Sequence, residues 1–112
     1  MASAFVPNRG DIVWLEFTPQ AGHEQTGRRP ALVLSPRSYN AAAGLALFCP
    51  ITSRVKGYPF EVPLLANSPV RGVVLADQIK SLDWRARKAR LIGPAAEATV
   101  ADVLAKAQAL LN

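Results

Sequence analysis

A chain of 112 residues is long enough for one domain with a modest hydrophobic core, and we expect residues 1–112 to form that single domain. Its 13 lysines and arginines outnumber 8 acidic residues, and the net charge of +5 favours a polyanionic partner, although a soluble domain with scattered surface lysines has the same balance. A lone cysteine excludes an intrachain disulfide, and no apolar run approaches the roughly 20 residues of a membrane span.

The first half of the chain predicts three strands and one short helix. In chain order these are strands over residues 11–17, 31–35 and 45–51, with a helix over residues 36–43 before the last of them. Both faces of the first strand are largely apolar, so we expect it deep in the fold. Pro30 suits the first position of the second strand because proline cannot donate to a ladder. Ser35 is the expected N-cap of the helix, and Gly44 its C-terminal glycine.

The second half predicts further short strands and a longer helix. The expected strands cover residues 58–65, 73–76 and 79–82, and a basic stretch from Trp84 to Arg90 then leads to an apolar pair at 91–92. Helical spacing is seen at Val100, Val103, Leu104, Ala107, Leu110 and Leu111, in a helix that starts between Pro94 and Thr99. The pattern predicts a mainly β, α+β fold: a small, strongly bent, partly closed sheet with helices packed on it.

The polar loop between the first two strands concentrates reactive side chains. Residues 22–30 include the only histidine, His23, beside Glu24, Gln25 and two adjacent arginines. Loops of this length between strands are often functional. Cys49 lies in an apolar run and is expected to be a small buried hydrophobe rather than a nucleophile. The sequence has no metal-ligand spacing and no glycine-rich phosphate loop, so we expect no metal and no cofactor.

Several motifs, in the same order along nearly the whole chain, resemble those of the MazF/PemK (Kid-like) toxins. The matching segments are Gly22-x-Glu24-Gln25-x-Gly27-x-Arg29-Pro30, Pro50-x-Thr52, Lys56-Gly57-Tyr58-Pro59-Phe60-Glu61-Val62 and Ala76-Asp77-Gln78-x-Lys80-Ser81. Members of this family are ribosome-independent mRNA endoribonucleases of type II toxin–antitoxin systems. The resemblance implies the CcdB/MazF-like toxin fold, an SH3-like barrel with appended helices. It also implies a homodimer, single-stranded RNA as substrate, and a MazE-like antitoxin with an acidic, disordered tail.

RNA is cut without metal when its own 2′-hydroxyl attacks the adjacent phosphorus, which leaves a 2′,3′-cyclic phosphate and a 5′-hydroxyl. Arg29 is the expected stabiliser of the phosphorane, because its planar fork matches two phosphate oxygens. The resemblance also implies acid–base catalysis by this arginine, which stays open because a guanidinium seldom loses a proton. Thr52 matches the family's catalytic threonine, and Glu24 is expected to orient Arg29 or to accept a proton.

The expected RNA-binding residues are His23, Gln25, Arg28, Arg54, Lys56, Asp77, Gln78, Arg85 and Arg87. His23 is a candidate acid or base, or else a loop-packing residue. Asp77 and Gln78 interrupt an apolar run, which suggests base recognition or a structural hydrogen bond. Leu75 stands where some relatives carry an arginine, and this departure argues against a catalytic Asp77. Tyr58 and Trp84 are candidates for stacking on bases or for the core.

Two other functions fit parts of the sequence. A gyrase-poisoning toxin shares the general fold but acts through a C-terminal end that carries tryptophan, whereas the tryptophans here are at positions 14 and 84. A non-catalytic RNA-binding barrel would explain the charge but not the motifs around Arg29 and Thr52. The N-terminus lacks the basic and apolar regions of a signal peptide, so we expect a cytoplasmic protein. The sequence does not specify which RNA word is cleaved.

Overall fold

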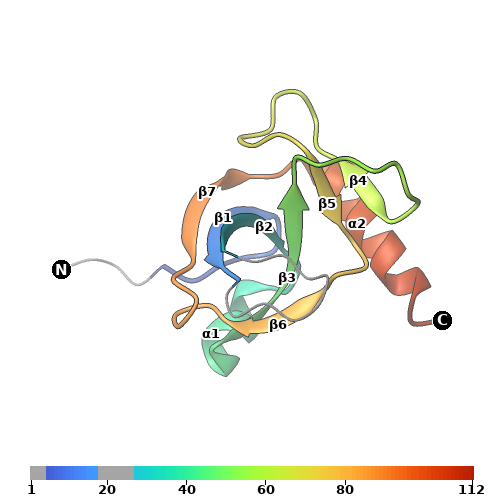
Figure 1. Cartoon of the computed structure of the whole chain (residues 1–112). Helices are drawn as coiled ribbons and strands as arrows, with labels where there is room; N and C mark the ends of the chain where they lie inside the picture. The colour runs from blue at the N-terminus through green and yellow to red at the C-terminus, as the bar shows by residue number, and fades with distance from the viewer. Residues whose placement is uncertain (1–4, 18–26) are drawn as a thin grey trace.

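The computed structural model describes residues 5–17 and 27–112, which form a seven-stranded antiparallel sheet and two helices (Figure 1). In chain order the elements are β1 (Asp11–Glu16), β2 (Arg28–Val33), α1 (Arg37–Ala43), β3 (Leu45–Thr52), β4 (Glu61–Pro63), β5 (Val73–Leu75), β6 (Lys80–Asp83), β7 (Arg90–Pro94) and α2 (Glu97–Ala109). The expected mainly β, α+β fold is therefore confirmed.

The longest strand, β3, organises the sheet. It pairs with β2 along one edge, while β6 and then β5 pair with successive parts of its other edge. The remaining pairs extend the strand order to β4-β5-β3-β2-β1-β7. Figure 1 shows this sheet curling around an interior. β4 and β7 stand at opposite ends of the order, and no pairing among the described strands joins them, so the curled sheet stays open.

The two faces of the sheet bury separate cores. Successive residues of a strand point to opposite faces, so β1 and β2 contribute alternate side chains to each core. Ile12 lies in one core together with Val103, and α2 therefore covers this face. Val13 lies in the other core with Phe48 and Trp84.

Cys49 is completely buried in the core beneath α2, as a small apolar residue would be. Its burial, with a smaller contribution from the negative charge of Asp77, raises the pKa of the thiol to about 12. Because the thiolate is the reactive form, this cysteine stays a neutral core residue at physiological pH, which agrees with the prediction.

β2 begins three residues earlier than predicted, and Pro30 is its third residue rather than its first. The Phe17 N–H donates to the Gly27 carbonyl at 2.8 Å, so these two residues form a hydrogen-bonded pair. Hydrogen-bonded and non-hydrogen-bonded pairs alternate along an antiparallel ladder. Pro30 therefore falls in a non-hydrogen-bonded pair with Trp14, and its nitrogen faces away from β1. On that side β3 pairs with β2 only from Ala31 onward. The proline therefore costs the ladder no hydrogen bond, although it lacks an N–H, and the strand continues through it.

Ser35 does not cap α1, contrary to the prediction. Pro36 occupies the N-cap position, and no side chain caps the helix. The Ser35 hydroxyl instead donates to Asn40 Oδ1 at 2.6 Å and accepts the Leu47 N–H at 2.8 Å, which joins α1 to β3. At the other end of the helix, Gly44 adopts the expected left-handed conformation, with φ of 71°.

Two other segments differ from the prediction. The strand expected over residues 58–65 is reduced to β4, because the Glu61 N–H donates to the Tyr58 carbonyl at 3.1 Å and closes a turn. α2 starts within the expected range, but Leu110 and Leu111 lie beyond its end and are exposed. Of the described helices, none has the length and apolar character needed to cross a bilayer.

The two tryptophans lie in different environments. Trp84, which was expected either to stack on bases or to lie in the core, is only 4% exposed, and its indole N–H donates to the Asn40 carbonyl at 3.0 Å. The core alternative is therefore confirmed, because the indole fills the core inside the sheet. Trp14 lies on the strand expected to be deeply buried, yet its side chain is 40% exposed. A strand with two apolar faces shows no alternation from which the exposed position can be recognised.

Candidate active site

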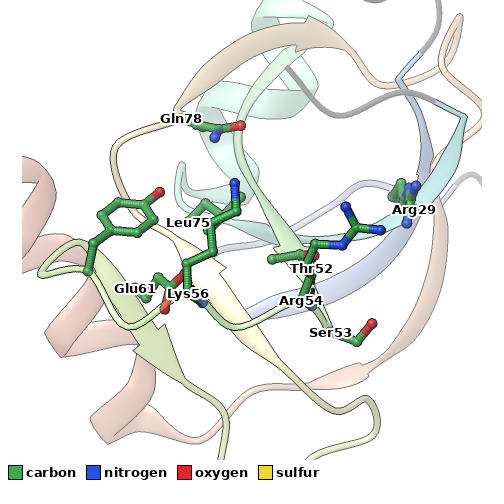
Figure 2. Close-up of a pocket in the computed structure, with 9 residues that line it drawn as sticks. Arg29, Thr52, Ser53, Arg54, Lys56, Glu61, Leu75 and Gln78 are labelled. Carbon is green, nitrogen blue, oxygen red and sulfur yellow. Dashed lines mark hydrogen bonds between the residues drawn. The ribbon is translucent and has the colours of Figure 1, made fainter. Parts of the chain in front are cut away.

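A polar pocket of about 320 Å³ lies where β3 ends and the next loop begins (Figure 2). The described residues that line it are Arg29, Thr52, Ser53, Arg54, Lys56, Tyr58, Glu61, Leu75 and Gln78. Three of these side chains are cationic and only Glu61 is acidic, so the described wall carries a net positive charge. Such a wall suits a ligand that bears phosphate groups.

Strands β2 and β3 bring Arg29 and Thr52 to the same pocket. The ladder between the two strands ends with the pair Ala31 and Pro50, and Arg29 and Thr52 each lie two residues beyond that pair. Alternate residues of a strand point to the same face, so both side chains extend from the face of Ala31 and Pro50. Both side chains line the pocket, which they enter from the ends of their two strands (Figure 2). The structure thus brings together two of the three residues that were predicted to be catalytic.

Thr52 is nearly buried at the end of β3, with 9% of its surface exposed. Its Oγ1 accepts the Arg54 N–H at 3.1 Å, which forms a short turn at the start of the loop. A threonine hydroxyl also carries one hydrogen of its own, which this bond does not use. Thr52 can therefore hold the loop and donate to a ligand in the pocket at the same time.

The basic loop of residues 53–57 is held by a carboxylate from β4. Glu61 accepts the Lys56 N–H at 3.0 Å with one oxygen and the Gly57 N–H at 2.8 Å with the other. Gly57 adopts a φ of +83°, which glycine tolerates at little cost. These bonds fix the backbone that carries Arg54 and Lys56 along the pocket (Figure 2).

A second hydrogen bond ties this part of the chain to the turn between β5 and β6. The Tyr58 hydroxyl donates to Asp77 Oδ1 at 3.1 Å. Burial raises the pKa of Tyr58, and the hydrogen bond to Asp77 and the charges of Asp77 and Glu61 raise it further. Asp77 itself is exposed and does not line the pocket, whereas Gln78 does. The buried Gln78 Oε1 makes no hydrogen bond within the described part of the chain.

Three arginines expected to contact RNA lie outside this pocket. Arg28 donates through Nη2 to a carbonyl in the β6–β7 turn at 3.3 Å. Arg85 lies 4.8 Å from the centroid of the buried Trp84 ring. Arg87 donates through Nη1 to the Glu16 carbonyl at 3.3 Å. They are therefore gathered around the β6–β7 turn rather than around Arg29.

The remaining expected residues, His23, Glu24 and Gln25, lie outside the described residues. Three residues that line the pocket, Ser53, Glu61 and Leu75, were not predicted to do so. Glu61 lies within a matched motif, but the sequence did not indicate that this acid belongs to the basic site. Its role is to accept backbone N–H groups of the loop, and this depends on the backbone geometry. Among residues 5–17 and 27–112, no three His, Cys, Asp or Glu side chains gather as metal ligands would.

The sequence and the fold both match known proteins. Residues 8–111 match the family described as the PemK-like, MazF-like toxin of type II toxin–antitoxin systems. The chain is 47% identical over 112 residues to the endoribonuclease toxin MazF of Escherichia coli K12, with 100% of each chain covered. A crystal structure of MazF from Deinococcus radiodurans matches with a TM-score of 0.93 and 58% identity, covering 96% of this chain and 98% of that one. A MazE–MazF crystal structure from the same organism matches with a TM-score of 0.86 and 51% identity, covering 96% and 97%.

Proposed function

Since the chain belongs to the PemK-like, MazF-like toxins of type II toxin–antitoxin systems and is an endoribonuclease toxin, we propose that it cleaves single-stranded mRNA at specific sequences without ribosome or metal. Cleavage of mRNA in the cytoplasm would stop translation and growth. The observation that carries the proposal is that Arg29 and Thr52 line the same cationic pocket. Arg54 and Lys56 supply the remaining positive charge along the path of the RNA backbone.

The reaction uses the RNA's own 2′-hydroxyl as nucleophile. Its oxygen forms a bond to the adjacent phosphorus, the bond from phosphorus to the 5′-oxygen breaks, and a 2′,3′-cyclic phosphate and a 5′-hydroxyl result. One proton leaves the 2′-oxygen and one is delivered to the 5′-oxygen. Negative charge grows on the two free phosphorane oxygens, where Arg29 offers a bidentate fork and Thr52 a hydroxyl hydrogen.

The proton transfers are assigned by chemical type. Glu24 is our candidate for the group that takes the 2′-proton, either directly or by orienting Arg29, and His23 is the alternative because histidine titrates near neutral pH. Arg29 acts mainly by electrostatic stabilisation, because a guanidinium seldom releases a proton. Glu24 and His23 belong to the segment outside the described residues.

RNA recognition is divided between backbone and base contacts. We assign Arg54 and Lys56 to phosphates near the scissile bond, where they fix register without reading sequence. Gln78 faces the pocket with an acceptor that has no partner among the described residues, which suits the edge of an unpaired base. Gln25 is a second candidate for base reading, and Asp77 acts through its hydrogen bond to Tyr58.

Two protein partners complete the proposal. The chain pairs with a second copy to form a homodimer, as small domains with exposed apolar residues commonly do. It also binds a MazE-like antitoxin, whose acidic, disordered tail folds over the basic pocket and covers it. The MazE–MazF structure of Deinococcus radiodurans supports this partner. Sedimentation at micromolar concentration tests the dimer, and rescue of growth by an acidic protein encoded next to this chain tests the antitoxin.

The function itself is tested by digesting a long natural mRNA in the presence of EDTA and mapping the cut sites by primer extension. We expect cuts at one recurring short sequence, and cleavage about 10²–10³ slower with Arg29→Ala protein. Arg37→Ala, which changes an exposed arginine of α1 outside the pocket, should cut normally. RNA that is bound but left intact would indicate a non-catalytic barrel, and inhibition of gyrase without any RNA cleavage would indicate the gyrase-poison class.

A further inference from the structure

We propose that the face of β1 around Trp14 is a second contact site for single-stranded RNA, in which the indole stacks on an unpaired base beyond those held in the pocket. The inference rests on the proposed endoribonuclease function and concerns where the RNA runs outside the pocket. Trp14, rather than the buried Trp84, is then the tryptophan that stacks on a base.

The exposed indole lies between two neighbouring strands. The ladders pair Trp14 with Pro30 on β2 and with Arg90 on β7. Directly opposite residues share a face, so these three side chains lie side by side on one surface. Trp14 is 40% exposed and belongs to neither core. A rigid aromatic surface of this kind is what sequence-tolerant stacking on single-stranded RNA uses.

Cations flank the indole on the same face. Arg28 precedes Pro30 by two residues, so its side chain points to the same side of β2. Arg28 and Arg90 are both exposed, and Nη2 of Arg28 donates to the Lys88 carbonyl at 3.3 Å. Glu16, opposite Arg28, adds an acid to this face. The balance of charge favours a polyanion, and stacking beside arginines is the pattern of single-strand binding surfaces.

The face around Trp14 is joined to the pocket by two consecutive residues of β2. Arg29 points into the pocket, while Arg28, whose Cα is about 3.8 Å away, points to the Trp14 side. The ladder between β2 and β3 ends at Ala31, so residues 28–30 along this edge of β2 form no ladder pair with β3 within the described part of the chain. An RNA chain that leaves the pocket across this edge meets Arg28 and then Trp14.

The test compares two RNAs that carry a 2′-deoxy nucleotide at the cleavage site, one just spanning the recognised sequence and one extended on both sides. We expect wild-type protein to bind the extended RNA more tightly. Trp14→Leu should weaken binding of the extended RNA about five- to a hundredfold and leave the short RNA unaffected. Trp14→Phe should restore most of the loss because it retains an aromatic face. Tyr39→Leu, at another exposed aromatic on α1, is the control and should change neither affinity.

Should Trp14→Leu unfold, Arg90→Gln serves instead and should lower the salt dependence of binding to the extended RNA by about one ion. Equal binding of the extended RNA by wild type and Trp14→Leu overturns the inference while the pocket function stands. A Trp14→Leu protein that becomes monomeric with unchanged RNA affinity overturns it too, and makes this face a subunit interface. Failure of wild type to bind the short RNA removes the proposed function and this inference together.

Discussion

Gly72 lies so close to Thr52 that a Cβ on Gly72 would stand 2.2 Å from the Thr52 carbonyl oxygen and 2.8 Å from its carbonyl carbon. Gly72 also has a φ of +124°, a conformation that other residues rarely adopt. The Gly72 carbonyl accepts the Leu64 N–H at 3.0 Å, so the glycine cannot simply move away. A residue that does not itself line the pocket therefore sets where the backbone of the candidate catalytic threonine lies.

Gly72→Ala should accordingly lower both stability and cleavage. We expect overpacking against the Thr52 backbone to reduce the free energy of unfolding by about 1–3 kcal/mol, measured by urea denaturation. The folded variant should also cleave RNA more slowly, because Thr52 and its hydroxyl are displaced. Gly44→Ala is the matched control: Gly44 has a φ of +71°, but a Cβ there would meet no atom of the described residues within 4 Å, so this change should strain the backbone and leave cleavage normal. Normal cleavage by folded Gly72→Ala would contradict this.

Replacing Glu61 should change KM, and the direction of that change distinguishes a purely electrostatic role from a positioning role. If the carboxylate only added negative charge to the pocket, Glu61→Gln would tighten RNA binding. Because it instead accepts two N–H groups of the 53–57 loop, we expect Glu61→Gln to raise KM several-fold, and Glu61→Ala to raise it further, with kcat less affected. Steady-state kinetics on a short RNA measures this, with Glu97→Gln on α2 as control. A lower KM in Glu61→Gln would rule out the positioning role.

The Tyr58–Asp77 pair predicts a dependence on alkaline pH. The pKa of Tyr58 is raised by burial and by its bond to Asp77, so this bond contributes full stability below the ordinary tyrosine pKa of about 10 and is lost as pH rises through the raised value. Asp77→Asn should lower the Tyr58 pKa but leave it above normal, since burial remains. Ultraviolet absorbance of tyrosinate follows the titration, and Tyr58→Phe assigns it. An unchanged titration in Asp77→Asn would show that the carboxylate does not act on Tyr58.

Arg29 and Thr52 should differ in how much they contribute to the reaction. Loss of one preorganised hydrogen-bond donor to developing charge typically costs about 10²–10³ in rate, which we expect for Arg29→Ala in single-turnover cleavage. Arg29→Lys should recover little, because an ammonium cannot form the bidentate fork. Thr52→Ala should cost about ten- to a hundredfold, as a neutral donor is lost. All variants should remain folded, and fully active Arg29→Ala protein would remove the basis of the mechanism.

The sequence predicted elements where local chemistry decides, as at Gly44, which ends α1 in the left-handed conformation. It was wrong about Ser35 because a distant partner, the Leu47 N–H, competes for the hydroxyl. The sequence did not indicate which of Trp14 and Trp84 is buried, because the burial of each indole depends on which strands cover it. The pairing of β2 with β3, which brings Arg29 and Thr52 to one pocket, is likewise a non-local property. The site residues were recognised from motifs, whereas the contacts of Glu61 and Gly72 required the structure.

The most direct test of the mechanism is cleavage of a short RNA with a single 2′-deoxy nucleotide on the 5′ side of the scissile phosphate. The substitution removes the attacking oxygen and leaves the bases, the phosphates and the proposed phosphate contacts of Arg29 and Thr52 in place. We predict that the protein binds this RNA as tightly as the unmodified one and does not cut it, while unmodified RNA yields a 2′,3′-cyclic phosphate and a 5′-hydroxyl. Cleavage of the 2′-deoxy RNA, or products ending in a 3′-hydroxyl, would contradict the mechanism.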